Sequence, residues 1–241
     1  MPQIVTRIER PDAALVERFR HVRMDQIIKL LHPGQLLDSA IKPLAHRDWH
    51  ILGPAVTVSG ADGSSLSGIL AAGVAQAGDV IVMAAGNPAG YAWGGGQTLS
   101  AEHAGCAGVV VDGSVVDADA ILQRATPVFC RGSTLQSGTR EELGSINVPV
   151  VCGGVTIQPG DLVIGTLDGV CVIPREQAPA MIDQVERESF RIEGNIAKLK
   201  ATRSTIFALR GGRAITQDLD IEWIDWVSRS RRSGRSPAAP P

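Results

Sequence analysis

The sequence has no run of apolar residues long enough to cross a membrane. Its longest apolar stretches, residues 79–85 and 105–111, have the length of single strands, whereas a membrane-spanning helix needs about 20 such residues. The N-terminal segment MPQIVTRIERPD also lacks the apolar stretch of a secretory signal peptide. We therefore expect a cytoplasmic protein that does not bind a membrane.

Cysteine and excess charge of one sign are scarce as well. The four cysteines show neither CxxC nor CxxxH spacing and lie in apolar segments, and the five histidines show no metal-binding spacing such as HxxxH. We therefore expect reduced core thiols, without disulfides or a zinc site. The net charge of -2 gives no general attraction to nucleic acid, so no nucleic-acid partner is expected.

The pattern of apolar residues predicts an α/β fold. Two helices are expected first, at residues 12–22 and 24–31. Strands and helices then alternate, with strands at 53–58, 79–83, 108–111 and 127–130 and helices at 64–77, 98–104 and 119–124. Four more strands, joined by turns, are expected at 148–151, 155–157, 162–165 and 170–173. Parallel and antiparallel pairing should therefore coexist.

The C-terminal third predicts a long helix and then a tail. Residues 175–200 are polar with one apolar face. Two glycines after Arg210 mark a break, and a short helix is expected at 218–227. Residues 228–241, SRSRRSGRSPAAPP, have the composition of a disordered basic tail. We expect one domain over residues 1–210, followed by the short helix and tail over 211–241.

Residues 86–132 are the most informative part of the chain, and they begin with the glycine-dense segment GNPAGYAWGGG at residues 86–96. The glycine-dense segment precedes a predicted helix, so backbone N–H groups at Gly94, Gly95, Gly96 and Gln97 could receive a substrate carboxylate. The alternative is a flexible loop with close backbone packing. These four residues are the candidate substrate-binding residues.

Asp117 ends the motif GVVVDGSVVD and precedes a predicted helix. Its carboxylate could hold a hard cation, because Mg²⁺ keeps much of its hydration and needs only one or two protein carboxylates. The alternative is a helix N-cap, a position where aspartate is common.

The ordered series of motifs resembles the RraA-like family. These motifs are GPAVTV, AGDVIV, a glycine-rich stretch with WG, AGVVVDGxxxD, PVFCRG and GVTIQPGDLVIGTLDGVCVIP, followed by a long charged helix. The resemblance runs from about residue 15 to residue 200. It implies an α/β/β sandwich of mixed parallel and antiparallel strands, assembled as a homotrimer or a hexamer, with active sites between subunits.

The resemblance also implies an activity. The family includes class II 4-hydroxy-4-methyl-2-oxoglutarate aldolases, which also decarboxylate oxaloacetate. By analogy, the chain would be a metal-dependent lyase using Mg²⁺ or Mn²⁺ on a small 2-oxo acid, with an enolate intermediate. Other members are catalytically silent regulators that bind the RNA-degrading endonuclease E, and this alternative stays open.

The chain departs from the family pattern at two positions. The family's aldolases carry a carboxylate in a WG(D/E)LL turn, and Gly95 stands in its place. They also carry an arginine before the metal-binding aspartate in DGxxRD, and here Val116 precedes Asp117. The resemblance thus makes Asp117 the candidate metal ligand and catalytic residue. A hydrogen bond to a charged group contributes roughly 1.5 to 3 kcal/mol, so loss of the arginine should slow catalysis or suit a less anionic ligand.

Four further polar residues are weaker candidates. Arg131 or Arg140 could replace the missing arginine, although arginine is usual in the family at the first of these positions. Asp112 follows a strand and precedes a glycine, which is typical of a turn residue as well as of a base. Glu193, on the long helix, is the candidate for an acid that reaches a neighbouring subunit.

Overall fold

The computed structural model describes residues 1–45, 49–60, 66–85, 91–136 and 143–221. The chain divides into two compact units, Met1–Ser189 and Phe190–Pro241. The predicted tail, most of the predicted helix at 218–227 and residues 86–90 of the glycine-dense segment lie outside the described residues.

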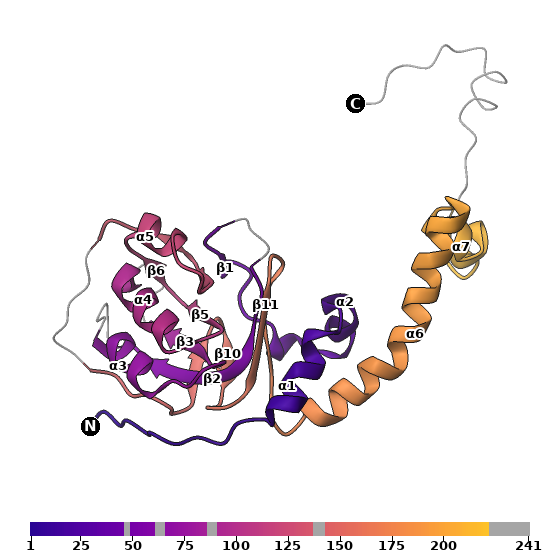
Figure 1. The fold of residues 1–241 in the computed structure, drawn as a ribbon. Coiled ribbons are helices and arrows are strands. Elements are labelled where there is room, and N and C mark those ends of the chain that lie inside the picture. Colours follow the sequence, from indigo (N-terminus) through magenta and orange to yellow (C-terminus); the bar gives the residue numbers. More distant parts are fainter. Residues whose placement is uncertain (46–48, 61–65, 86–90, 137–142, 222–241) are drawn as a thin grey trace, which may run out of the picture. The chain divides into compact units, whose positions relative to one another are not determined.

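A seven-stranded mixed sheet forms the centre of the first unit (Figure 1). Its strands are β1 (Lys42–Pro43), β2 (Ile51–Ser59), β3 (Val80–Ala84), β5 (Gly108–Val111), β7 (Val128–Cys130), β11 (Leu162–Thr166) and β12 (Gly169–Ile173), in the order β1-β7-β5-β3-β2-β11-β12. The four neighbours β7, β5, β3 and β2 run parallel. The outer pairs are antiparallel, because β1 pairs with β7, β11 with β2 and β12 with β11.

The two faces of this sheet carry different layers. Helices α3 (Leu66–Val74), α4 (Gly95–His103) and α5 (Ala118–Leu122) lie on one face, and the hairpin of β9 (Val150–Cys152) and β10 (Val155–Ile157) lies on the other. Along β3, Ile81 and Met83 pack on the helical side, whereas Val80 and Val82 pack on the hairpin side. A strand buried on both faces is apolar throughout. The predicted α/β/β sandwich is therefore confirmed.

A third apolar cluster joins the termini of the first unit to the β11–β12 hairpin. It contains Phe19 of α1 (Ala13–Arg20) and Ile182 and Val185 of α6 (Ala178–Thr202), packed with Leu162 and Ile173. The second opening helix is shorter than predicted: α2 (Met24–Ile27) changes to the 3₁₀ helix η1 (Ile28–Leu30), followed by η2 (Pro33–Gln35).

The second unit begins within α6. Beyond α6 it contains α7 (Ile206–Leu209) and the 3₁₀ helix η3 (Gly212–Thr216). Its apolar residues Ile206, Phe207 and Leu209 are exposed. The described helices include none that is long and apolar enough to span a membrane.

All four cysteines are free and buried, as the sequence predicts. Burial raises the pKa of Cys106 and Cys130 to about 11 and that of Cys171 to about 12. Burial likewise raises the pKa of Cys152. These thiols are therefore protonated packing residues and not nucleophiles.

A partly buried ion pair ties the N-terminal segment to the start of β3. The Arg10 guanidinium donates two hydrogen bonds to the Asp79 carboxylate, at 2.9 Å from Nε and 2.8 Å from Nη2. The hydrogen bond with Asp79 raises the pKa of Arg10. Asp79 also accepts a hydrogen bond from the backbone N–H of Gln76 at 2.7 Å. The carboxylate therefore closes the turn that precedes β3.

We predict that Arg10→Met lowers the free energy of unfolding by about 2 to 4 kcal/mol, because it leaves the buried Asp79 carboxylate without its cation. Arg20→Met is the matched control, since Arg20 pairs with Glu17 in an exposed position and its loss should cost under about 0.5 kcal/mol. Urea denaturation of both variants measures the difference. Equal effects would contradict the prediction.

Candidate functional site

A small parallel sheet brings the two predicted motifs together. Its strands are β4 (Tyr91–Trp93), β6 (Ser114–Val115) and β8 (Gly132–Ser133). The pairing continues one residue past the end of β6, because the Val116 N–H donates to the carbonyl of Trp93, the last residue of β4, at 3.0 Å. The glycine run after Trp93 therefore lies next to Val116 and Asp117.

Three hydrogen bonds fix the first turn of α4. The Trp93 indole N–H donates to Thr98 Oγ1 at 2.9 Å, and Thr98 Oγ1 donates to the Gly94 carbonyl at 3.0 Å. The Thr98 backbone N–H donates to the same carbonyl at 3.0 Å. Because of these bonds, Gly94 is the N-cap and the helix begins at Gly95, three residues earlier than the helix predicted at 98–104.

The three glycines differ in their surroundings. A Cβ at Gly95 would lie 2.8 Å from Ala120 Cβ, so α4 and α5 meet there in direct contact. At Gly96 a Cβ would meet no described atom within 4 Å. No side-chain cap is formed at this helix end, and the positive end of a helix favours an anion.

Gln97, the fourth predicted substrate-binding residue, is buried. Its Nε2 donates to the Ala92 carbonyl at 3.5 Å, and its Oε1 accepts a hydrogen bond from the Tyr91 hydroxyl at 3.4 Å. The side chain therefore braces β4. A direct contact between Gln97 and a substrate stays a prediction.

Asp117 occupies the N-cap position of α5 without acting as a cap. Its backbone is left-handed, at φ 56° and ψ 42°, and its side chain accepts no capping hydrogen bond. Such a conformation costs about 1 kcal/mol or more in residues other than glycine. The carboxylate is exposed and makes no hydrogen bond or ion pair with any residue that the structure describes. It is therefore free to bind a ligand.

The donor set at Asp117 fits only a hydrated cation. Among the described residues no group of three or more His, Cys, Asp or Glu side chains could enclose a metal, which does not fit a tetrahedral Zn²⁺ site. A single free carboxylate fits Mg²⁺, which retains several waters and binds through one or two carboxylates. Asp117 is thus the residue that would hold it.

The other candidates are engaged elsewhere. Arg131 donates from Nε to Asp112 at 2.6 Å and from Nη1 to Asp38 at 2.8 Å. Asp112 also accepts a hydrogen bond from the Gly153 backbone N–H at 2.6 Å. Both side chains are therefore committed to a structural network. Arg140 and the side chain of Glu193 lie outside the described part of the chain.

A depression of about 550 Å³ opens beside Asp117. The first turn of α5 forms one side, and Ser133, Thr134 and the fully exposed Leu135 form the other. It gives small molecules access to the Asp117 carboxylate.

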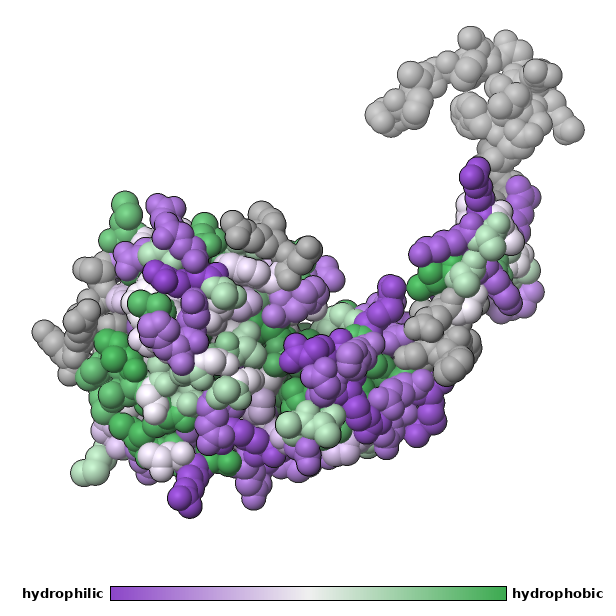
Figure 2. Space-filling view, viewed as in Figure 1, coloured by the Kyte–Doolittle hydropathy of each residue, from purple (hydrophilic) through white to green (hydrophobic). Residues whose placement is uncertain are grey.

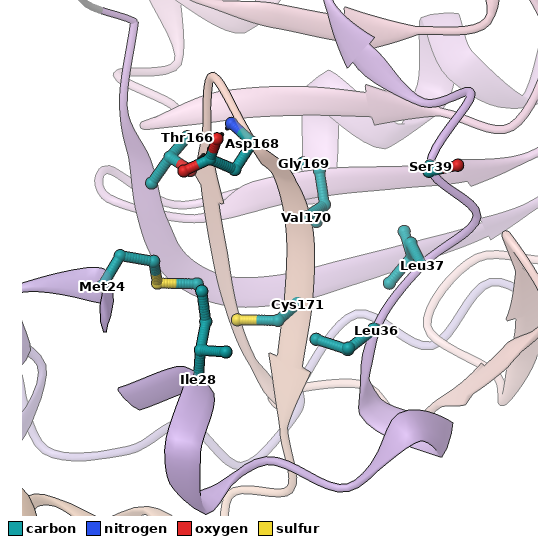
Figure 3. Close-up of a pocket in the computed structure, with 10 residues that line it drawn as sticks. All are labelled: Met24, Ile28, Leu36, Leu37, Ser39, Thr166, Asp168, Gly169, Val170 and Cys171. Atoms are coloured by element: carbon teal, nitrogen blue, oxygen red, sulfur yellow. Dashed lines mark hydrogen bonds between the residues drawn. The ribbon is translucent and has the colours of Figure 1, made fainter. Parts of the chain in front are cut away.

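A second recess, of about 210 Å³, lies at the β11–β12 hairpin (Figure 3). Its walls are mainly apolar, with Met24, Ile28 and Leu36 around the sulfur of Cys171. Asp168 and Ser39 lie at its edges. A buried thiol with a raised pKa supplies no nucleophile, so the chemistry of the molecule is better sought at Asp117.

Comparison with known proteins identifies the family of the chain. The family model RraA-like, described as Aldolase/RraA, matches residues 24–172. The chain belongs to the RraA-like family. Asp117 and the glycines of α4 lie inside the matched region.

Similar proteins cover most of the chain. A protein from Halalkalibacterium halodurans, provisionally named 4-hydroxy-4-methyl-2-oxoglutarate aldolase, is 37% identical over 196 residues, which are 81% of this chain and 91% of that protein. The crystal structure of Streptomyces coelicolor RraAS2, described as an unusual member of the RNase ES inhibitor RraA family, matches with a TM-score of 0.68 and 29% identity over 78% of this chain and 99% of that one. An uncharacterized protein from Pseudomonas syringae matches with a TM-score of 0.70 and 26% identity, over 84% and 100% of the two chains.

Two features of the site were not foreseen from the sequence. Tyr91 contributes a hydroxyl beside Gly94, and Ala120 packs onto Gly95. Tyr91 precedes a register shift between β4 and β6, so strand alternation could not place its side chain. The contact of Ala120 depends on how two helices approach, which no local pattern records.

We predict that Gly95→Asp lowers the free energy of unfolding by about 1 to 3 kcal/mol, because the new Cβ overlaps Ala120. Gly96→Asp is the matched control, since its Cβ has open space and an acid is favourable in the first turn. Adding Ala120→Gly to Gly95→Asp should recover part of the loss. Thermal and urea denaturation test this, and additive effects of the two substitutions would contradict it.

Proposed function

We propose that the chain is a metal-dependent lyase that acts on a small 2-oxo acid. The reaction is retro-aldol cleavage of substrates of the 4-hydroxy-4-methyl-2-oxoglutarate type, decarboxylation of oxaloacetate, or both. The observation that carries the proposal is the free, exposed Asp117 carboxylate next to the glycine end of α4. The provisional aldolase name of the Halalkalibacterium protein supports the same class.

Each residue contributes by position and charge. Asp117 holds Mg²⁺ or Mn²⁺, directly or through water, and this cation supplies a Lewis acid for the 2-keto oxygen. The backbone N–H groups at the start of α4 attract the substrate carboxylate. Val116 lines the space next to Gly94 with a methyl group. It offers no charge to the substrate, so turnover should be slower than in members that carry an arginine.

A catalytically silent, protein-binding regulator is the second candidate. The contact between Gly95 and Ala120 favours it, because α5 fills the space that an acidic side chain on α4 would enter. The description of the Streptomyces neighbour as part of an RNase inhibitor family points the same way. On this alternative, Mg²⁺ should not bind at Asp117.

We predict that the protein with Mg²⁺ or Mn²⁺ releases pyruvate from 4-hydroxy-4-methyl-2-oxoglutarate or from oxaloacetate. Chelator should abolish the activity, and Asp117→Asn should reduce it about tenfold or more, since even residues that only orient metal ligands contribute 10- to 100-fold. A coupled lactate dehydrogenase assay measures pyruvate, and titration calorimetry measures Mg²⁺ binding.

Asp168→Asn is the matched control, because Asp168 is an exposed acid at the turn between β11 and β12. It should leave activity and Mg²⁺ binding unchanged. Activity that survives both chelator and Asp117→Asn would refute metal-dependent catalysis. Absence of both activity and Mg²⁺ binding would favour the regulator.

We also propose that the chain forms a homotrimer or a hexamer. Support comes from large apolar side chains that remain exposed on the first unit: Leu135 beside the Asp117 depression, Val151 on β9, and Ile69 and Leu70 on α3. Figure 2 shows apolar residues gathered over α3. Exposed apolar surface of this kind is typical of subunit contacts.

We predict a mass in light scattering of three or six times the 25.4 kDa of one chain. Leu135→Asp should shift the mass toward the monomer, because a carboxylate would be buried at the contact. Leu219→Asp, at an exposed leucine of the second unit, is the control and should leave the mass unchanged. A monomeric mass for the unmodified chain would refute the assembly.

A further inference from the structure

A small space beside Gly94 is bordered by two oxygens and a methyl group. Tyr91 Oη and Asp117 Oδ2 each lie 3.5 Å from the point where a Cβ on residue 94 would be, and Val116 Cγ2 lies 3.1 Å from it. Because both oxygens lie 3.5 Å from the same point, the distance between Tyr91 Oη and Asp117 Oδ2 is at most twice that value. A hydroxyl oxygen at this point would be in contact with all three groups, whereas a methyl group would press against Val116 Cγ2.

Glycine at position 94 is what keeps the space open. Its backbone is extended, at φ -155° and ψ -175°, a conformation that any residue adopts. Backbone strain therefore does not require glycine here. A side chain at this position would instead fill the space between Tyr91 and Asp117.

Both oxygens face the space as hydrogen-bond acceptors. The Gln97 amide is oriented by its bond from Nε2 to the Ala92 carbonyl, which leaves Oε1 to receive the Tyr91 hydroxyl proton. The lone pairs of Tyr91 Oη are then available to a ligand, and an ionised carboxylate is acceptor-only. The space thus suits a hydroxyl group that donates, and two acceptor oxygens disfavour a ligand carboxylate.

We propose that Tyr91 is a specificity-determining residue that accepts a hydrogen bond from the hydroxyl group of a hydroxylated 2-oxo acid. This inference rests on the proposed function for the class of ligand. Tyr91 Oη accepts the hydrogen bond that the substrate hydroxyl group donates, Asp117 Oδ2 borders the same space, and Val116 Cγ2 packs against the carbon that bears the hydroxyl group. The site therefore distinguishes an aldol from a 2-oxo acid of the same length without a hydroxyl.

The test compares two ligands that differ by one oxygen. 2,4-Dihydroxybutanoate and 2-hydroxybutanoate lack the 2-keto group and cannot be cleaved, so their binding is independent of turnover. Titration calorimetry with saturating Mg²⁺ should show tighter binding of the dihydroxy acid to the unmodified protein, by about three- to tenfold, the value of one hydrogen bond. Tyr91→Phe should remove this preference and leave the affinity for 2-hydroxybutanoate unchanged.

Two glycine variants complete the test. Gly94→Ala fills the space and should also remove the preference. Gly73→Ala is the control, since Gly73 lies in α3, where a Cβ would meet no described atom within 4 Å, and the preference should survive. If circular dichroism shows that Tyr91→Phe does not fold, the loss of the preference in Gly94→Ala decides the test.

The inference is overturned if the unmodified protein binds neither acid, shows no preference, or keeps its preference in both Tyr91→Phe and Gly94→Ala. It is also overturned if Tyr91→Phe weakens the binding of both acids by the same factor. Failure of the proposed function has a different signature, because pyruvate release can be absent while the preference for the dihydroxy acid is present.

Discussion

The site depends on how closely α4 approaches α5. At Gly95 the α4 backbone is so near Ala120 that the helices meet without an intervening side chain. The hydrogen bonds among Trp93, Thr98 and Gly94 fix the start of α4 at this contact. The same approach brings Asp117 Cβ to 3.3 Å from the Cβ position of residue 95, so the negative carboxylate lies at the positive end of the α4 dipole. Packing thereby sets the electrostatics of the site.

The arrangement is rigid because both faces of the large sheet are covered by packed layers. Alternate residues of β3 pack into different clusters, so neither face of the strand is free to adjust alone. Interiors packed in this way transmit small displacements to their neighbours. The parallel strands β3 and β5 end at the same edge of the large sheet. Asp112 directly follows β5 at this edge, and the chain then enters β6 of the small sheet of β4, β6 and β8. Site residues thus extend from a rigid base, which suits a site that must hold a ligand by few contacts.

The sequence predicted most of the fold and part of the site. The continuous apolar runs at residues 79–83 and 108–111 reveal buried strands, because the side chains on each face of the strand pack directly on a layer. The resemblance directed attention to Asp117, and its position next to the glycines is observed. The early start of α4 was not predicted, because glycine disfavours helices and only the bonds from Thr98 outweigh this. Tyr91 was not predicted either, since a register shift decides where its hydroxyl points.

The bridge from Asp38 through Arg131 and Asp112 to Gly153 has a consequence for biosynthesis. It joins segments that are far apart along the chain, so it forms only after all of them have been synthesised, and loop-closure entropy slows its formation further. When Asp117 has just emerged from the ribosome, Arg131 and Gly153 have not, so the nascent chain does not yet have this hydrogen-bonded bridge. The edge of the sheet that carries the site is therefore completed late in folding, and a chain stalled before residue 153 would expose unpaired carboxylates and apolar strands to chaperones.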